Sequence, residues 1–169
     1  NPNPKINNPE IISEFIQRYP LAFVYAANQT GQENQFESSL LPILLGTGNN
    51  LITHLARRNP LLTILKKNGG KMTLQFFGPQ RYISPQIYQT NGNVPTWNYS
   101  QVEVTGTAVI RESKDALEQI LKDSVAFFET RNGTSWSYNI PDQQKLPMLN
   151  AISGLEIQIE TIDNKFKLN

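Results

Sequence analysis

The stretch from Phe76 to Ile110 constrains the fold of this chain more than any other part of its sequence. An apolar run at 72–77 predicts a strand that stops at Gly78-Pro79. Apolar and polar residues alternate over 101–110, which predicts a second strand with one apolar face. The intervening loop is dense in rings and prolines, namely Tyr82, Pro85, Tyr88, Pro95, Trp97 and Tyr99. Two strands that flank a stiff aromatic loop are therefore predicted.

Such an aromatic loop has two possible roles. It can cover the protein's own core, or it can form one wall of a site for a flat ligand. Aromatic clusters fill cores more often than they hold cofactors, so residue types alone leave both roles open.

Patterns elsewhere predict a mixture of strands and helices. Asn8-Pro9-Glu10 is a typical helix start, and we expect that helix to run to about Tyr19 and a longer helix to begin after Ser113. Further strands are expected at 21–27, 40–45, 51–54 and 155–160, short helices at 61–65 and 145–152, and loops at 28–34 and 131–144. About six strands that do not alternate regularly with helices indicate an antiparallel barrel with helices outside it.

Length and composition narrow the function classes. A chain of 169 residues has the length of one domain, 1–169. Its formal charge of +1 gives no broad field for nucleic acid, which argues against direct DNA binding without excluding a local patch. The absence of cysteine excludes disulfides and thiolate metal sites, and a single histidine excludes a histidine metal cluster. Neither a signal peptide nor a membrane span is evident, so we expect a cytoplasmic protein.

A basic segment between a predicted strand and a predicted helix is a candidate phosphate site. It contains His54, Arg57, Arg58 and Asn59, followed by Pro60. Guanidinium groups offer paired donors that match phosphate oxygens, and the free N–H groups of a helix start add to them. The alternative is a solvated basic turn, since Arg-Arg pairs are common on protein surfaces.

Several blocks resemble the PaiB family of FMN-binding negative transcriptional regulators. The similar blocks are Gly-Pro-Gln-Arg-Tyr-Ile-Ser-Pro at 78–85, Val-Pro-Thr-Trp-Asn-Tyr at 94–99, Val-Thr-Gly at 104–106 and His-Leu-Ala-Arg-Arg-Asn-Pro at 54–60. The resemblance implies a mostly β (α+β) protein, an antiparallel six-stranded FMN-binding split β-barrel with flanking helices. It also implies a homodimer with FMN at the interface.

The resemblance also implies roles for individual residues. His54, Arg57, Arg58 and Asn59 would contact the FMN phosphate. Pro95, Thr96, Trp97 and Asn98 would line the flavin ring, and Lys165 and Lys167 would reach the cofactor from the closing Lys-Phe-Lys-Leu segment. No catalytic residue is assigned.

The chain departs from the family pattern at two places. Leu40 stands before Leu41-Pro42 where the family typically has histidine, which removes a polar group near the expected site. The chain also ends at Asn169, before the Ser-Gln-Asn-Arg segment and tail that usually follow in the family.

Three functions remain open at this point. The first is a cytoplasmic FMN-binding domain that resembles PaiB. The second is a regulator whose partner is another protein or DNA and whose flavin is a structural or sensing ligand. The third is an FMN-dependent reductase or oxidase that uses NAD(P)H, which rests on fold analogy alone.

Overall fold

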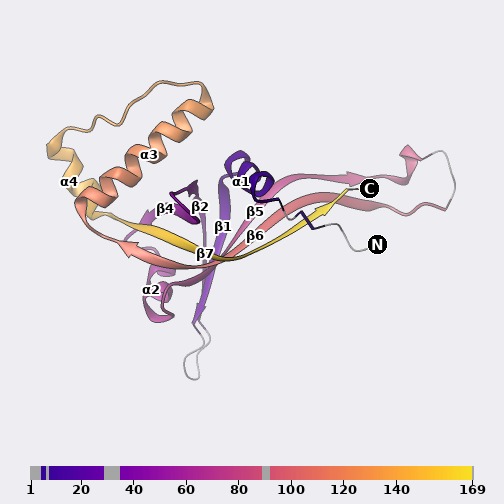
Figure 1. Ribbon diagram of the computed structural model, residues 1–169, viewed down its shortest axis with the longest axis horizontal. Helices are drawn as coiled ribbons and strands as arrows, with labels where there is room; N and C mark the ends of the chain where they lie inside the picture. The colour runs from indigo at the N-terminus through magenta and orange to yellow at the C-terminus, as the bar shows by residue number, and fades with distance from the viewer. Residues whose placement is uncertain (1–4, 7, 29–34, 89–91, 169) are drawn as a thin grey trace.

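The computed structural model describes residues 5–6, 8–28, 35–88 and 92–168, and one antiparallel sheet dominates it (Figure 1). The sheet has seven strands in the order β2-β1-β5-β6-β7-β4-β3. Its strands are β1 (Leu21–Asn28), β2 (Gln35–Pro42), β3 (Leu44–Leu45), β4 (Asn50–Ala56), β5 (Lys71–Ile83), β6 (Thr96–Arg111) and β7 (Ile152–Lys167). Of the loop predicted at 28–34, Asn28 is the last residue of β1 and residues 29–34 lie outside the described residues. A mostly β, antiparallel fold is therefore confirmed.

The two edges of the sheet, β2 and β3, are separated in the chain by Ile43 alone. The backbone N–H of Ile43 donates to the Pro20 carbonyl at 2.8 Å, and Thr53 on β4 donates from Oγ1 to the Pro42 carbonyl at 2.7 Å. The sheet thus curls until its edges adjoin, but no strand pairing among the described residues closes it. The predicted strand at 40–45 is broken at Ile43, and the predicted six-stranded barrel is not confirmed in that form.

The helices begin where side chains cap their first turns. They are α1 (Pro9–Arg18), α2 (Pro60–Lys67), α3 (Lys114–Asn132) and α4 (Asp142–Asn150), with a short 3-10 turn η1 at Pro85–Ile87. The Asn8 side chain accepts from the Glu10 N–H and the Ser113 side chain from the Ala116 N–H, which satisfies N–H groups that a helix start leaves unpaired. The predicted starts of α1 and α3 are confirmed. None of the described helices is both long and apolar enough to cross a membrane.

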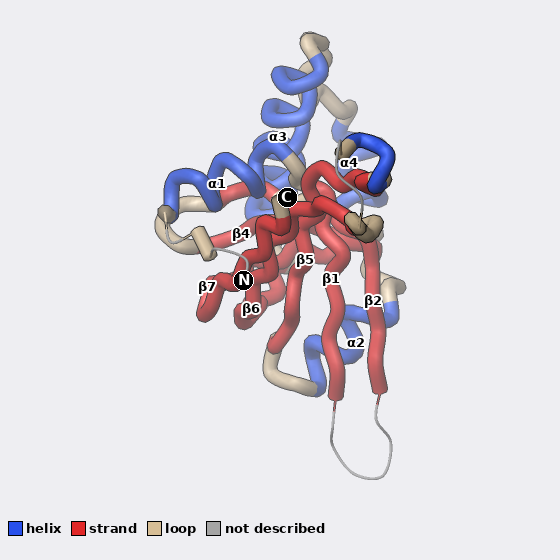
Figure 2. The backbone as a smooth tube through the Cα atoms, turned by 90° about the vertical axis from the view of Figure 1, so that its right-hand side faces the viewer, coloured by secondary structure: helices blue, strands red, loops and turns tan. Residues whose placement is uncertain are grey.

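The core lies inside the curled sheet. Its fully buried strand residues come from β1, β4, β5, β6 and β7 and include Val24, Leu51, Leu74, Phe76, Val102, Val104, Leu155 and Ile157. Helix α2 adds one apolar side with Leu61, Leu62, Ile64 and Leu65, and it lies against β1 and β2 (Figure 2). Helices α3 and α4 cover β4 and β7 instead. Helix α2 therefore covers a different part of the sheet from α3 and α4.

The prediction that a strand stops at Gly78-Pro79 and gives way to a loop is wrong. Strand β5 continues to Ile83, β6 starts at Thr96, and the pairing register shifts between Phe77 and Gln80. Such a bulge accommodates the missing N–H of Pro79 without ending the strand. The resulting hairpin extends beyond the body of the protein, with the end of β7 alongside it (Figure 1).

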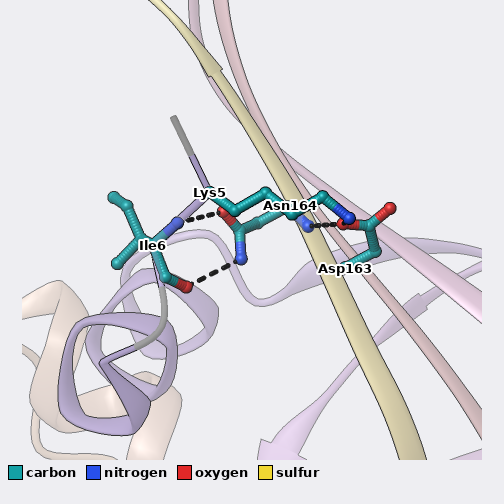
Figure 3. Close-up of polar contacts among 4 residues, drawn as sticks. All are labelled: Lys5, Ile6, Asp163 and Asn164. Atoms are coloured by element: carbon teal, nitrogen blue, oxygen red, sulfur yellow. Dashed lines mark hydrogen bonds and ion pairs between the residues drawn. The ribbon is translucent and has the colours of Figure 1, made fainter. Parts of the chain in front are cut away.

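The segment before α1 is fastened to β7 by one buried side chain (Figure 3). Asn164, 6% exposed, accepts from the Ile6 N–H at 2.8 Å and donates to the Ile6 carbonyl at 2.9 Å. Beside it, Lys5 and Asp163 form an ion pair of 2.8 Å. We call the contacts among these four residues the N-terminal clamp. The clamp holds the start of α1 against the distal part of the sheet.

We expect Asn164→Asp to lower the free energy of unfolding by about 2 kcal/mol. An aspartate side chain still accepts from Ile6 N–H, but it cannot donate to the Ile6 carbonyl and leaves that oxygen facing a buried charge. Urea unfolding measures the loss. Asn139→Asp makes the same chemical change at an exposed position and serves as the control. Equal stability of the two variants would show that the hydrogen bond from Asn164 to the Ile6 carbonyl contributes nothing.

Candidate functional site

Asn59 organises the turn between β4 and α2. Its Oδ1 accepts from the Leu61 N–H at 3.0 Å, so it caps the helix, and its Nδ2 donates to Ser39 Oγ on β2 at 2.8 Å. The N–H of Leu62 donates to the Asn59 carbonyl. Two N–H groups of the helix start are therefore used within the protein, which leaves fewer for a phosphate than the sequence suggested.

Arg57 and Arg58 are both exposed at this turn. The guanidinium of Arg57 donates to the Ile152 carbonyl at 3.1 Å and lies 4.0 Å from Glu112, whose carboxylate is also 3.7 Å from Lys66. These contacts occupy only part of a guanidinium's donors. The turn therefore presents two adjacent cations to solvent, which is the arrangement needed to bind an oxyanion.

His54 lies on β4 and is half-buried. It pairs with Gly154 on β7, so its side chain is on the face of the sheet where Ile120 of α3 packs against Gly154. Burial lowers the pKa of His54 from its ordinary value. A neutral imidazole would bring a hydrogen bond, but no positive charge, to a phosphate group.

The second predicted group lies at the start of β6. Trp97 is 53% exposed and meets Tyr82 edge-on across the hairpin, with ring centres 5.8 Å apart. Lys167 donates from Nζ to Thr96 Oγ1 at 2.7 Å, so the end of β7 and the hairpin are linked at this point. Pro95 is exposed beside them, Asn98 pairs with Arg81 in the ladder, and Lys165 is exposed opposite Gln101.

The structure does not bring the two predicted groups together. Residues 95–98 and the end of β7 lie on the part of the hairpin that points away from α2, whereas residues 57–59 lie at the start of α2 (Figure 1). One copy of the chain therefore presents a turn with two exposed arginines and an aromatic hairpin at separate places.

The sheet carries an apolar outer face that the sequence patterns did not predict. Strand β1 is apolar along nearly its whole length, but its alternate side chains point away from the core and line up with neighbours on β2 and β5. This outer face consists of Leu21, Phe23, Tyr25, Phe36, Leu40 and Phe77. Leu21, Phe36, Leu40 and Phe77 are each about half exposed, at 53%, 58%, 59% and 49%. The continuous apolar run of β1 was the available signal, since a strand that is apolar on both faces has two surfaces to cover.

A cavity of about 300 Å³ opens at one end of this outer face. Tyr25 and Phe36 supply rings to it, and Lys71, Thr73 and Thr105 supply polar groups. The two rings are in contact, with centres 5.7 Å apart. None of the predicted flavin contacts lines this cavity.

Comparison with known proteins gives matches along most of the chain. The sequence profile of a family described as "Putative FMN-binding domain" matches residues 1–161. The Bacillus subtilis protein named "Protease synthase and sporulation protein PAI 2" is 28% identical over 170 residues, which cover 98% of this chain and 78% of that protein.

Two solved structures have a similar fold. The first is a "putative 5-nitroimidazole antibiotic resistance protein" from Bacteroides thetaiotaomicron, with a TM-score of 0.72, 11% identity and coverage of 96% of this chain and 86% of that chain. The second is the FAD and heme binding protein from Mycobacterium smegmatis, with a TM-score of 0.69, 15% identity and coverage of 98% and 74%. At these identities the likeness shows the fold alone.

The profile match spans nearly the whole chain and agrees with the motifs at 54–60 and 78–106. It confirms the predicted family and its cofactor, FMN. The chain belongs to the family of FMN-binding domains.

Proposed function

We propose that this protein is a regulatory flavoprotein whose two copies share each FMN. The phosphate would bind at Arg57 and Arg58 of one copy, and the flavin ring would bind against residues 95–98 of the other. The observation that carries this proposal is the separation of the two groups within one chain (Figure 1). A second copy supplies the missing half of the site without any change in the fold.

The assignment of the FMN phosphate to Arg57 and Arg58 rests on their charge. Arg58 is exposed, and the guanidinium of Arg57 is anchored at Ile152, so one cation is positioned and the other is free to move toward a ligand. Arginine suits this task because its planar donors match phosphate oxygens in pairs. Asn59 would act through the position of the turn, since its own amide is engaged by Ser39 and Leu61.

The assignment of the flavin ring to residues 95–98 rests on the shape of the aromatic surface there. Trp97 and Tyr82 form an exposed aromatic surface, which suits a planar isoalloxazine. Lys167 and Thr96 lie beside it and offer polar contacts to the ring's edge. Flavin supplies redox chemistry when it is bound, and these residues would orient the ring and limit water around it.

The outer face supports a homodimer. Exposed apolar residues gathered on neighbouring strands mark a surface that another molecule covers. In a dimer built on this face, Leu40 would pack against apolar residues, which explains the absence of the polar group expected there.

We propose one domain per chain, in which β2 and β3 together form one strand of a six-stranded split barrel.

The near-neutral charge favours a regulatory role through a protein partner over direct DNA contact.

Absorbance of the purified protein, before and after FMN is added and the excess removed, tests cofactor retention. A flavin spectrum without NAD(P)H-dependent bleaching supports the regulatory role. Bleaching with turnover would establish the reductase instead, and a protein that does not retain FMN overturns the proposal.

We expect Leu40→Glu to convert the dimer to monomer and to weaken FMN binding about tenfold, because it places a charge in an apolar interface. Light scattering measures the mass and fluorescence titration measures the affinity. Leu146→Glu makes the same change at a side chain of α4 that is 44% exposed. This control should change neither the mass of the protein nor its affinity for FMN. A Leu40→Glu variant that remains dimeric would exclude the outer face as the interface.

A further inference from the structure

A second cavity, of about 280 Å³, lies between α1 and the adjoining strands β5, β6 and β7. Its lining is largely apolar, from Ile11, Phe15, Tyr19, Pro79, Phe166 and Leu168. The ring of Phe15 lies 5.0 Å from that of Tyr19 and 5.5 Å, edge-on, from that of Phe166. Such a cluster of rings favours an added aromatic group, and the volume suits a ligand with one ring.

The rim of this cavity carries two opposite charges. Glu14 and Arg18 both line it and stand one helical turn apart on α1. Neither side chain forms an ion pair with the other or with any other residue in the part of the chain that the structure describes. The guanidinium of Arg131 reaches this turn but donates to the carbonyl oxygens of Gln17 and Arg18. A carboxylate and a guanidinium therefore face the same opening with their charges unmatched.

The walls of the cavity are held in place before any ligand arrives. The N-terminal clamp fastens the chain just before α1 to Asn164 on β7 (Figure 3). Phe166 follows two residues later on the same strand and lines the cavity. On the opposite wall, Pro79 belongs to the bulge of β5, and its carbonyl accepts from Ser100 Oγ at 3.4 Å. A preformed cavity loses less conformational entropy on binding than a flexible one.

We propose that this cavity binds a small zwitterion with an aromatic side chain, that is, an aromatic amino acid. The ring of the ligand packs against the cluster of Phe15, Tyr19 and Phe166. The ammonium group pairs with Glu14 and the carboxylate pairs with Arg18. None of the proposed flavin contacts lines this cavity, so the site adds a ligand to the function proposed above and does not depend on it.

The charges at the rim are exposed, so each should contribute modestly and mainly to selectivity. We expect L-phenylalanine to bind the full chain with a Kd on the order of 0.1 to 1 mM. Phenethylamine lacks the carboxylate and 3-phenylpropionate lacks the ammonium group, and each should bind about fivefold more weakly.

Crossed variants test the assignment of each charge by calorimetric or NMR titration. Arg18→Gln should weaken the binding of phenylalanine and of 3-phenylpropionate about fivefold, because their carboxylate loses its partner. The binding of phenethylamine, which has no carboxylate, should be unchanged. Glu14→Gln should weaken the binding of phenylalanine and of phenethylamine, because their ammonium group loses its partner. The binding of 3-phenylpropionate should be unchanged. A variant that weakens all three probes equally would overturn the charge assignment.

Ile11→Trp tests the location of the ring. Ile11 is 42% exposed at the cavity, so a larger side chain can fill the opening without disturbing the core, and phenylalanine binding should be lost. Leu146→Trp on α4 is the matched control and should bind as the wild type does. The FMN spectrum of both variants should be unchanged, which separates this site from the flavin site. Phenylalanine that does not bind at 10 mM, or that binds equally to Ile11→Trp, overturns the proposal.

Discussion

The Arg57→Ala/Arg58→Ala double variant is expected to bind FMN about 100-fold more weakly than the wild-type protein, because each guanidinium supplies charge-assisted hydrogen bonds to the phosphate. The two arginines are exposed, so we take about tenfold for each, the lower end of the usual range. Quenching of flavin fluorescence on titration measures the Kd.

Riboflavin provides a matched ligand for this experiment, since it has the same ring and no phosphate. The double variant and the wild-type protein should bind riboflavin with equal affinity. Lys114→Ala/Lys122→Ala removes the same net charge on α3 and should leave FMN binding unchanged. Because Arg57 also contacts Ile152 and Glu112, thermal unfolding should be measured in parallel. Equal losses for FMN and riboflavin would show that the two arginines do not hold the phosphate.

Gly70→Ala is expected to lower the free energy of unfolding by about 4 kcal/mol, as a sum of backbone strain and overpacking. Gly70 has a φ of +85°, its N–H donates to the Leu65 carbonyl, and its carbonyl accepts from the Ala108 N–H at 2.8 Å. A methyl group there would overlap the carbonyl oxygen of Ala108. The end of α2 and strand β6 could not both keep their places.

Gly69 offers a control in the same turn. Its φ is +74°, so Gly69→Ala carries a similar backbone strain, but an added methyl group there meets no atom within 4 Å. We expect Gly69→Ala to cost about 1 kcal/mol, the strain alone. Urea unfolding of the two variants separates the two effects. If both variants are equally stable, close packing at Gly70 makes no contribution.

Local features of the fold were predictable because each depends on a few neighbouring residues. Asn8 and Ser113 cap helices by bonding N–H groups two or three residues ahead, so the starts of α1 and α3 were confirmed. Alternation over 101–110 was confirmed as part of β6. The motifs at 54–60 and 78–106 indicated the family and FMN, and the profile match confirmed both.

Errors arose where distant parts of the chain decide the outcome. Gly78-Pro79 ends a strand when nothing pairs beside it, but here β6 continues to pair beyond the bulge and β5 runs on to Ile83. The predicted last strand at 155–160 is extended to Ile152–Lys167 because β6 provides a partner along its length. The short helix expected at 145–152 spans Asp142–Asn150 instead, and α3 extends to Asn132, into the loop expected at 131–144.

The amino-acid sequence by itself determined the family, its cofactor, the starts of α1 and α3 and most of the strands, since capping, periodicity and motifs act over short distances along the chain. Only the tertiary structure decided that residues 57–59 and 95–98 lie apart, that β1 presents a second apolar face, and that α1 forms a cavity with the end of β7. These features depend on strand register and on contacts between residues far apart in the chain. Periodicity within a single segment carries no information about either.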